Sequence, residues 1–212
     1  MVAKRAYDAT AKEARRQGIL DAADKLFGEE EQLPNVGRVA DAAGLAKGTV
    51  YLYFRTKEEI FAFLLLDGWS RVIETATRAL TAETSPAKAV AAFISAFAQA
   101  LDNESNLLRL DALGKGVLEE NMTSEALLAF KSQFHNRLEE AGAFFERTLH
   151  LAPGRGAQLL TRTHALTRGM WQSFGSGRAR QAAEATGATA FQTELREALI
   201  EYWRGAMQLT EP

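Results

Sequence analysis

The residues best suited to binding chemistry lie between Arg38 and Phe54, and that chemistry is hydrogen bonding to a polyanion. Ala40 and Gly44 are four positions apart and Val50 follows six positions later, a spacing typical of a helix-turn-helix. Ala40 lets two helices cross closely, Gly44 supplies the positive φ of the turn, and Val50 packs the second helix against the first. With Val50 and Phe54 facing inward, the opposite side of the second helix is exposed.

The exposed side of that helix suits the major groove of DNA. Lys47 can reach a phosphate or a guanine edge, and Gly48 permits close approach of the backbone. Hydroxyl groups of Thr49, Tyr51 and Tyr53 can donate hydrogen bonds to phosphate. Outside this motif, the two tyrosines would be interpreted as packed aromatic residues. The motif favours a surface contact instead.

Charge supports DNA binding only locally. The net charge is −2, and residues 1–60 hold as many acidic as basic side chains. Residues 1–20 nevertheless carry five basic and two acidic side chains, and residues 45–57 carry three basic and none acidic. Two basic patches are therefore expected within a neutral domain, and a dimer would double both.

The sequence contains none of the catalytic motifs that would indicate an enzyme. The chain of 212 residues has no cysteine, which excludes disulfides, thiolate nucleophiles and Cys-ligated metals. Nucleotide-binding glycine motifs, a nucleophile elbow and a His-Glu-x-x-His motif are all missing. No apolar run reaches the ~20 residues needed to span a bilayer. We expect a soluble, cytoplasmic protein that is not an enzyme and needs no cofactor or metal.

Helical periodicity predicts an all-α fold of about nine helices. The expected helices cover residues 12–27, 36–43, 47–54, 56–80, 86–101, 107–113, 124–149, 155–175 and 189–209. Asn35, Ser85, and either Thr123 or Ser124 are the expected N-caps. Gly114-Lys-Gly116 should interrupt a helix, and residues 175–187 should form a flexible loop. Residues 1–56 are predicted to form a helix-turn-helix domain and residues 57–212 a helical domain for effector binding and dimerisation.

The segment from Val39 to Phe61, VADAAGLAKGTVYLYFRTKEEIF, resembles the DNA-binding domain of TetR-family transcriptional regulators. The resemblance covers roughly residues 12–61. It implies a two-fold dimer of all-helical subunits, with an N-terminal DNA-binding domain and a C-terminal body that binds a small molecule. A two-fold dimer would read a roughly palindromic operator with half-sites about 34–36 Å apart, or a multiple of that spacing if two dimers bind.

The DNA contacts are assigned to nine residues on the basis of the motif and the resemblance. They are Asn35, Arg38, Lys47, Gly48, Thr49, Tyr51, Leu52, Tyr53 and Lys57. Two departures from the family pattern stand out. Ala46 replaces the usual Ser or Thr that opens the recognition helix, so its capping bond is lost. Gly37 lies at the position of the preceding helix where some family members carry a long basic side chain, which leaves Arg38 as the nearest candidate.

A ligand site in the helical body is expected to be lined by apolar and aromatic side chains. The candidates are Phe97, Phe130, Phe134, His135, Leu166, Met170, Trp171 and Phe174. Each could equally belong to the core of any helical protein. His135 is expected to be a hydrogen-bonded core histidine rather than half of a metal site with Glu139, and Trp171 and His164 could orient a ligand. The lining favours a small apolar or aromatic effector.

The sequence leaves several functions open. We favour a repressor that a small-molecule effector releases from its DNA operator, with a homodimer formed through apolar stripes on the last two helices. Those helices could instead pack within one subunit. An activator or architectural protein without an effector is one alternative. A helical small-molecule-binding or scaffold protein without operator-specific function is another.

Overall fold

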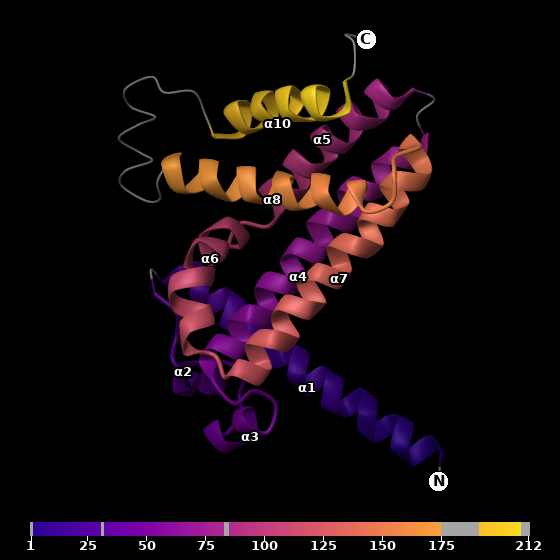
Figure 1. The fold of residues 1–212 in the computed structure, drawn as a ribbon. Helices are drawn as coiled ribbons and strands as arrows, with labels where there is room; N and C mark the ends of the chain where they lie inside the picture. Colours follow the sequence, from indigo (N-terminus) through magenta and orange to yellow (C-terminus); the bar gives the residue numbers. More distant parts are fainter. Residues whose placement is uncertain (1, 31, 83–84, 175–190, 209–212) are drawn as a thin grey trace. The chain divides into compact units, whose positions relative to one another are not determined.

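The computed structural model describes residues 2–30, 32–82, 85–174 and 191–208 (Figure 1). Within these ranges every regular element is helical, and nine of them are α-helices, which confirms the predicted fold class. The chain divides into two compact units. The first joins residues 1–66 to 113–130, and the second joins residues 67–112 to 131–212. No helix in the described ranges is both long and apolar enough to cross a membrane.

The first unit is built on three N-terminal helices and the start of a fourth. They are α1 (Val2–Glu29), α2 (Val36–Ala42), α3 (Lys47–Tyr51) and α4 (Lys57–Arg78). Ile19, Phe27, Val39 and Ile60 are fully buried and form its core. The ring of Phe27 packs 5.7 Å from that of Phe61, between centroids. α2 packs against both α1 and α3, so the short helices are held in place by α1.

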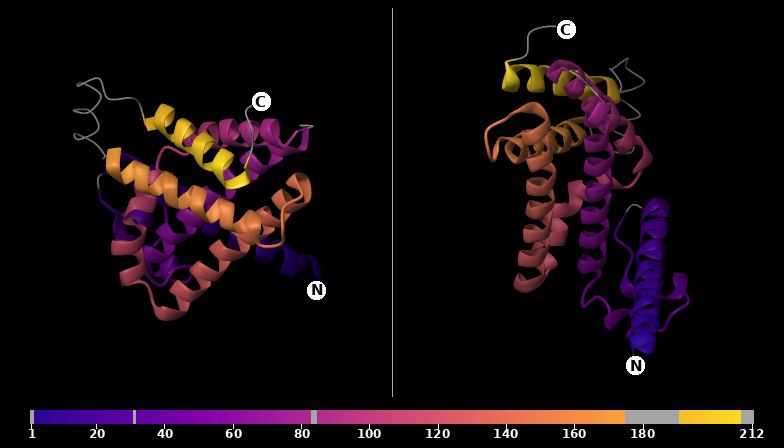
Figure 2. Two further views of the ribbon diagram at one scale, coloured as in Figure 1. Left: turned by 45° about the horizontal axis from the view of Figure 1, so that its top comes forward. Right: turned by 90° about the vertical axis from the view of Figure 1, so that its right-hand side faces the viewer.

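The second unit contains the rest of α4 and most of the later helices (Figures 1 and 2). The later elements of the chain are η1 (Ala79–Ala82), α5 (Pro86–Asn103), α6 (Leu107–Leu113), the π-helix η2 (Gly114–Glu119), α7 (Ser124–Leu149), α8 (Arg155–Phe174) and α10 (Phe191–Met207). Figure 1 shows α10 beside α8 and α5, and α10 packs against both of these helices.

Aromatic rings fill the core of the second unit. Phe93 lies 4.9 Å from Phe145 and 5.2 Å from Trp203, between ring centroids. Trp69 stacks on Phe97 with centroids 6.3 Å apart. Rings from α4, α5, α7 and α10 therefore meet in one buried cluster, and such pairs add stability beyond the area they bury.

Two glycines let α7 and α8 approach closely. A Cβ atom on Gly142 would overlap the backbone of Gly156 and Ala157, and one on Gly156 would overlap the backbone of Gly142. Only hydrogen fits at either position. The helices are therefore held together by direct backbone contact.

Local capping follows the sequence in most places. Ser85 Oγ accepts from the Lys88 backbone N–H, and Thr123 Oγ1 accepts from that of Ala126. Thr123 rather than Ser124 is thus the cap of α7.

Arg71 binds Glu104 with two hydrogen bonds of 2.6 and 2.8 Å. These bonds raise the pKa of Arg71 above its ordinary value, so this pair joins α4 to the end of α5 as ions.

Three helix boundaries differ from expectation. α1 begins at Val2 rather than Lys12, because its first ten residues include neither Gly nor Pro, the residues that most disfavour a helix. α3 ends at Tyr51 rather than Phe54, where β-branched and aromatic residues of low helix propensity follow one another. Gly114-Lys-Gly116 does not break the chain path, which continues as a π-helix. The loop expected at residues 175–187 lies outside the described residues.

Candidate nucleic-acid interface

The turn between α2 and α3 has the geometry that the motif requires. Gly44 has φ +66°, a left-handed conformation that glycine adopts without a Cβ penalty. Its N–H donates to Asp41 O at 3.1 Å, and the Leu45 N–H donates to Ala40 O at 2.9 Å. These bonds satisfy the last carbonyls of α2, and the predicted position of the turn is confirmed.

α3 is anchored by one face and open on the other. Val50 is 0% exposed and Phe54 is 1% exposed, whereas Leu52 is 80% exposed. A Cβ atom on Gly48 would meet nothing within 4 Å. Leu52 and Gly48 are one turn apart, so this face of α3 is open to solvent and accessible to another molecule.

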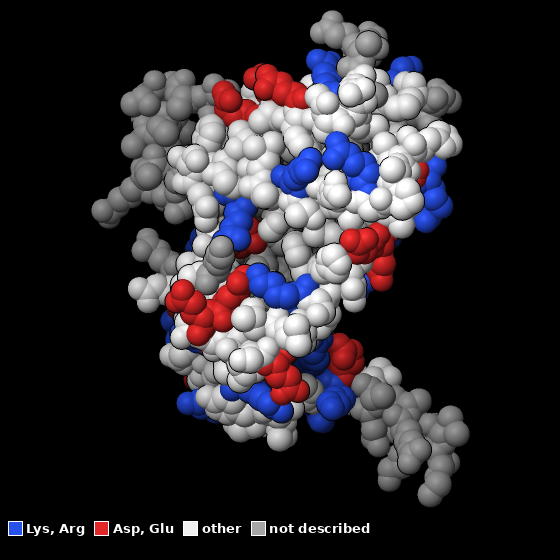
Figure 3. Space-filling view, in the orientation of Figure 1, with Lys and Arg blue, Asp and Glu red and all other residues white. Residues whose placement is uncertain are grey.

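Polar and basic groups flank this open surface. Lys47 is exposed, and its Nζ lies 5.9 Å from the ring centroid of Tyr51, which is itself 46% exposed. Thr49 and Tyr53 are half-buried. Figure 3 shows Lys and Arg side chains on the part of the first unit that carries α3. A hydroxyl, an ammonium and an open backbone therefore share one surface, as phosphate and base-edge contacts require.

Both departures from the family pattern are visible in the structure. Ala46 adopts the extended N-cap conformation (φ −69°, ψ 142°), but no side-chain hydrogen bond caps α3. A Cβ atom on Gly37 would lie 3.1 Å from Asn35 Oδ1, so the small residue keeps the cap of α2 in place. Asn35 Oδ1 accepts from the Arg38 backbone N–H at 3.1 Å. The predicted N-cap is confirmed.

Arg38 has an internal partner that the sequence did not reveal. Its Nη1 lies 2.7 Å from Glu30 Oε1, while 54% of its side chain remains exposed. A DNA phosphate would have to compete with this carboxylate. Glu30 lies eight residues earlier, on the other side of the break between α1 and α2, so no local pattern could have indicated the pair.

The start of α4 is fixed by its own caps. Thr56 Oγ1 accepts from the Glu59 backbone N–H at 3.2 Å, and Glu59 Oε2 accepts from the Arg55 backbone N–H at 2.7 Å. Lys57 is half-buried, with Nζ 3.9 Å from Glu58 Oε1. The segment that would present Lys57 to a phosphate is thus held by hydrogen bonds on both sides of this residue.

Arg16 is used inside the first unit. Its guanidinium lies 4.1 Å from the Phe63 ring centroid and 5.4 Å from that of Phe54. Cation–π contact of this kind holds α1 against α4 and the segment that follows α3. Arg16 therefore has a packing function, whereas Lys12 and Arg15 on the same helix are exposed.

The predicted ligand-binding residues occupy different surroundings. Phe97 is core, stacked on Trp69. Trp171 and Phe174 pack on Phe191 of α10, at 5.2 and 5.8 Å between centroids. Phe134 lies 5.1 Å from the ring of His164. Leu166 and Met170 are half-buried on α8, and Phe130 belongs to the first unit.

His135 does not lie in the core. Its side chain is 68% exposed, with Nε2 3.7 Å from Glu139 Oε1 one turn later. The expectation of a core histidine is wrong, because α7 buries no residue before Leu138, and His135 lies in this accessible first half of the helix. In the described residues no group of three or more His, Asp or Glu side chains could hold a metal ion.

A groove of about 460 Å³ lies between α4 and α7 in the second unit. Ile73, Thr77, Arg137, Ala141, Phe144 and Arg147 are among the residues that line it. The predicted ligand-binding residues do not contribute to it. Its arginines and its open surface could not be anticipated from the apolar periodicity of either helix.

The outer faces of α8 and α10 are less apolar than expected. Among described residues, the large hydrophobic side chains that are exposed are Tyr51, Leu52 and Leu128, which lie on neither helix. Half-buried Leu166, Ile200 and Tyr202 are among the apolar groups that remain partly accessible on these helices. Much of each predicted stripe is buried within the subunit, since α8 and α10 pack against each other.

Comparison with known proteins agrees with this geometry. A family model described as "Bacterial regulatory proteins, tetR family" matches residues 19–63, and one described as "Tetracyclin repressor-like, C-terminal domain" matches residues 66–209. The chain is 31% identical over 90 residues to the fatty acid metabolism regulator protein of Bacillus subtilis (strain 168). That match covers 42% of this chain and 46% of the regulator, so it spans about half of the relative's length.

Solved structures share the fold across most of the chain. The TetR-family regulator PfmR of Thermus thermophilus has a TM-score of 0.54 at 20% identity, covering 88% of this chain and 97% of that one. The regulator FadR of Bacillus subtilis, in complex with stearoyl-CoA, has a TM-score of 0.52 at 19% identity, covering 88% of this chain and 96% of that one. Together with an exposed recognition helix, the two family models show that the chain belongs to the TetR family of bacterial regulatory proteins, which are DNA-binding regulators and not enzymes.

Proposed function

We propose that the chain is a repressor that binds a specific DNA operator as a homodimer and is released by a small molecule. One observation supports DNA binding most directly. α3 buries Val50 completely while Leu52 and Gly48 stay open to solvent, so one face of a short, well-anchored helix is available to the major groove.

The operator is inferred from the symmetry of a two-fold dimer. Two copies of α3 would enter successive major grooves about 34–36 Å apart, which calls for a palindrome with half-sites one helical turn apart. The outer faces of α8 and α10 are proposed to pair as a four-helix interface through Leu166, Ile200 and Tyr202. Their half-buried state leaves contact area for a second copy.

The proposed effector is a small apolar or aromatic molecule bound by the second unit. Aromatic rings from α4, α5, α7 and α8 meet there, as at Phe97, Trp69 and Phe134. The FadR structure of Bacillus subtilis holds stearoyl-CoA, so long-chain acyl-CoA thioesters form one arm of an effector screen. Compounds with an aromatic frame form the other.

Coupling between the operator and the effector tests this proposal. Labelled duplex recovered by binding-site selection is titrated with the protein by fluorescence anisotropy, with and without each compound. Allosteric coupling is typically about 1–3 kcal/mol, or roughly 5–150-fold in affinity. Because coupling is reciprocal, saturating operator must weaken the effector by the same factor. An effector whose affinity is unchanged by operator DNA would contradict the mechanism.

A further inference from the structure

Asp111 of α6 is a buried carboxylate with incomplete hydrogen bonding. Its side chain is 6% exposed. Oδ1 lies 3.4 Å from His164 Nε2 and Oδ2 lies 3.6 Å from Arg168 Nε, both longer than a strong charge-assisted hydrogen bond. Oδ2 has no hydrogen-bond partner among the described residues. A buried acceptor without a donor among the described residues favours a ligand that can supply one.

Trp69 of α4 is a buried hydrogen-bond donor without an acceptor. It is 1% exposed, and its Nε1–H has no acceptor in the described part of the chain. Trp203 provides an internal comparison, because its Nε1–H donates to Thr163 Oγ1 at 3.1 Å. The fold therefore satisfies one buried indole and leaves the other unsatisfied.

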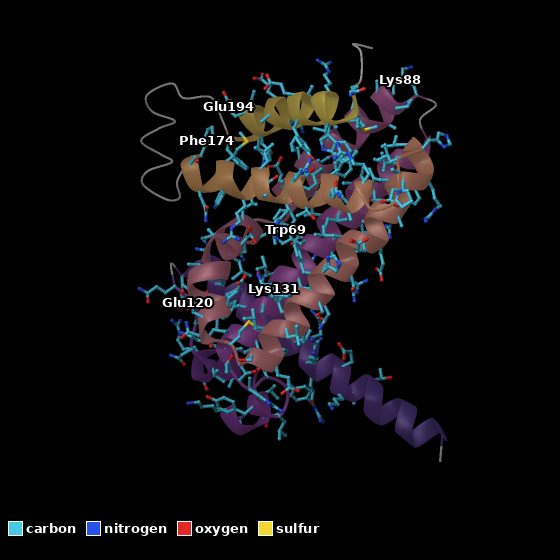
Figure 4. All side chains as sticks on the ribbon, in the orientation of Figure 1. Trp69, Lys88, Glu120, Lys131, Phe174 and Glu194 are labelled. Carbon is cyan, nitrogen blue, oxygen red and sulfur yellow. The ribbon has the colours of Figure 1, made fainter. Side chains whose placement is uncertain are left out.

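His164 connects the two unsatisfied groups. Its ring lies 4.6 Å from Trp69, edge to face, and its Nε2 faces Asp111. Phe134 covers it at 5.1 Å. Trp69, labelled in Figure 4, lies where α4 passes α8. An unpaired acceptor and an unpaired donor thus both lie close to one imidazole, among aromatic rings of the second unit.

We propose that the Asp111–His164–Trp69 cluster binds a neutral hydroxyl group carried by an apolar or aromatic effector. A hydroxyl can donate to Asp111 and can also accept, as the Trp69 N–H requires. The carboxylate of Asp111 and the guanidinium of Arg168 already balance in charge, so a charged head group would compete with one of them. A thioester carbonyl only accepts, and it would leave Asp111 Oδ2 unpaired.

Two matched pairs of probes test this inference on the wild-type protein without DNA. The pairs are 2-naphthol with 2-methylnaphthalene, and 1-nonanol with 1-methoxyoctane. The two compounds of each pair are similar in size, and only the first can donate a hydrogen bond. Binding is measured by isothermal titration calorimetry. We expect each hydroxyl compound to bind at least about tenfold tighter than its partner, as for hydrogen bonds to charged groups. Equal binding within the pairs, or no binding by either hydroxyl probe, would overturn the proposal.

Variants then locate the site. Asp111→Leu should remove the preference for the hydroxyl compound, and Trp69→Phe should reduce it. Trp203→Phe is the matched control, because it also replaces a buried indole with a smaller ring but removes an N–H that already has an acceptor. This variant should keep the preference for the hydroxyl compound. Thermal unfolding establishes that each variant is folded. A preference that survives Asp111→Leu would assign the hydroxyl to another site.

This inference rests on the proposed effector-binding function of the second unit, and the two can fail separately. Selective hydroxyl binding without release of the operator would retain the cluster as a binding site and refute the effector function. Release of the operator by an apolar compound that binds without hydroxyl selectivity would retain the effector function and refute the cluster as a hydroxyl-binding site.

Discussion

The crossing of α7 and α8 at Gly142 makes a quantitative prediction about stability. A methyl group there would overlap the backbone of Gly156 and Ala157, which cannot move aside as a flexible side chain can. Substitution Gly142→Ala must therefore push the two helices apart. The neighbouring core residues Leu138 and Phe145 would lose contacts as the gap opens.

Two opposing terms set the size of the effect. Overpacking a core costs about 1–3 kcal/mol, and a clash with backbone favours the upper end of that range. Alanine regains about 1 kcal/mol over glycine through its helix propensity. We expect a net loss of about 2 kcal/mol in the free energy of unfolding. At about 2–4 °C per kcal/mol, Tm falls by roughly 4–8 °C.

Circular dichroism at 222 nm during heating measures this change, with protein concentration held constant because unfolding of the proposed dimer would depend on concentration. Gly169→Ala on α8 is the matched control. A Cβ there meets nothing within 4 Å, so the same substitution should raise stability by about 0.4–1 kcal/mol. If Gly142→Ala unfolds at the wild-type temperature or above, the helices are not in backbone contact.

Three further predictions concern the first unit. Gly44→Val places a β-branched residue at φ +66° and should cost about 1–3 kcal/mol in chemical denaturation, and equal stability would place the turn elsewhere. Ala46→Ser supplies the missing cap of α3 and should raise stability by about 0.5–2 kcal/mol, whereas an unchanged midpoint of denaturation would mean that the serine hydroxyl does not cap. Lys47→Ala removes one phosphate contact per subunit, so the slope of log K against log salt for a dimer on its operator should fall by about 1.8, at about 0.9 per phosphate. An unchanged slope would show that Lys47 does not contact phosphate.

The sequence predicted the helix-turn-helix well because its determinants are local. Gly44, Val50 and Asn35 each act within a few residues of their own position, through a turn, a buried contact or a cap. The structure places all three as expected. The all-α class was equally accessible, since helical periodicity is a property of short windows.

The ligand-binding side was less predictable because it depends on contacts between distant helices. Asp111 and His164 are 53 residues apart, and nothing in the sequence shows that they meet. His135 is also exposed, contrary to the expectation of a core histidine. One local signal was available, because His164 and Arg168 are one turn apart and share a face of α8.

Selection of binding sites from random duplex DNA tests the central claim most directly. Wild type is run in parallel with Lys47→Ala/Tyr51→Ala, both exposed on α3, and with Lys25→Ala, exposed on α1, as control. We predict that wild type and the control enrich the same palindrome, with half-sites one helical turn apart, and that the α3 variant does not. A folded wild type that enriches nothing at low and physiological salt, or an α3 variant that enriches the same palindrome equally well, would contradict the account.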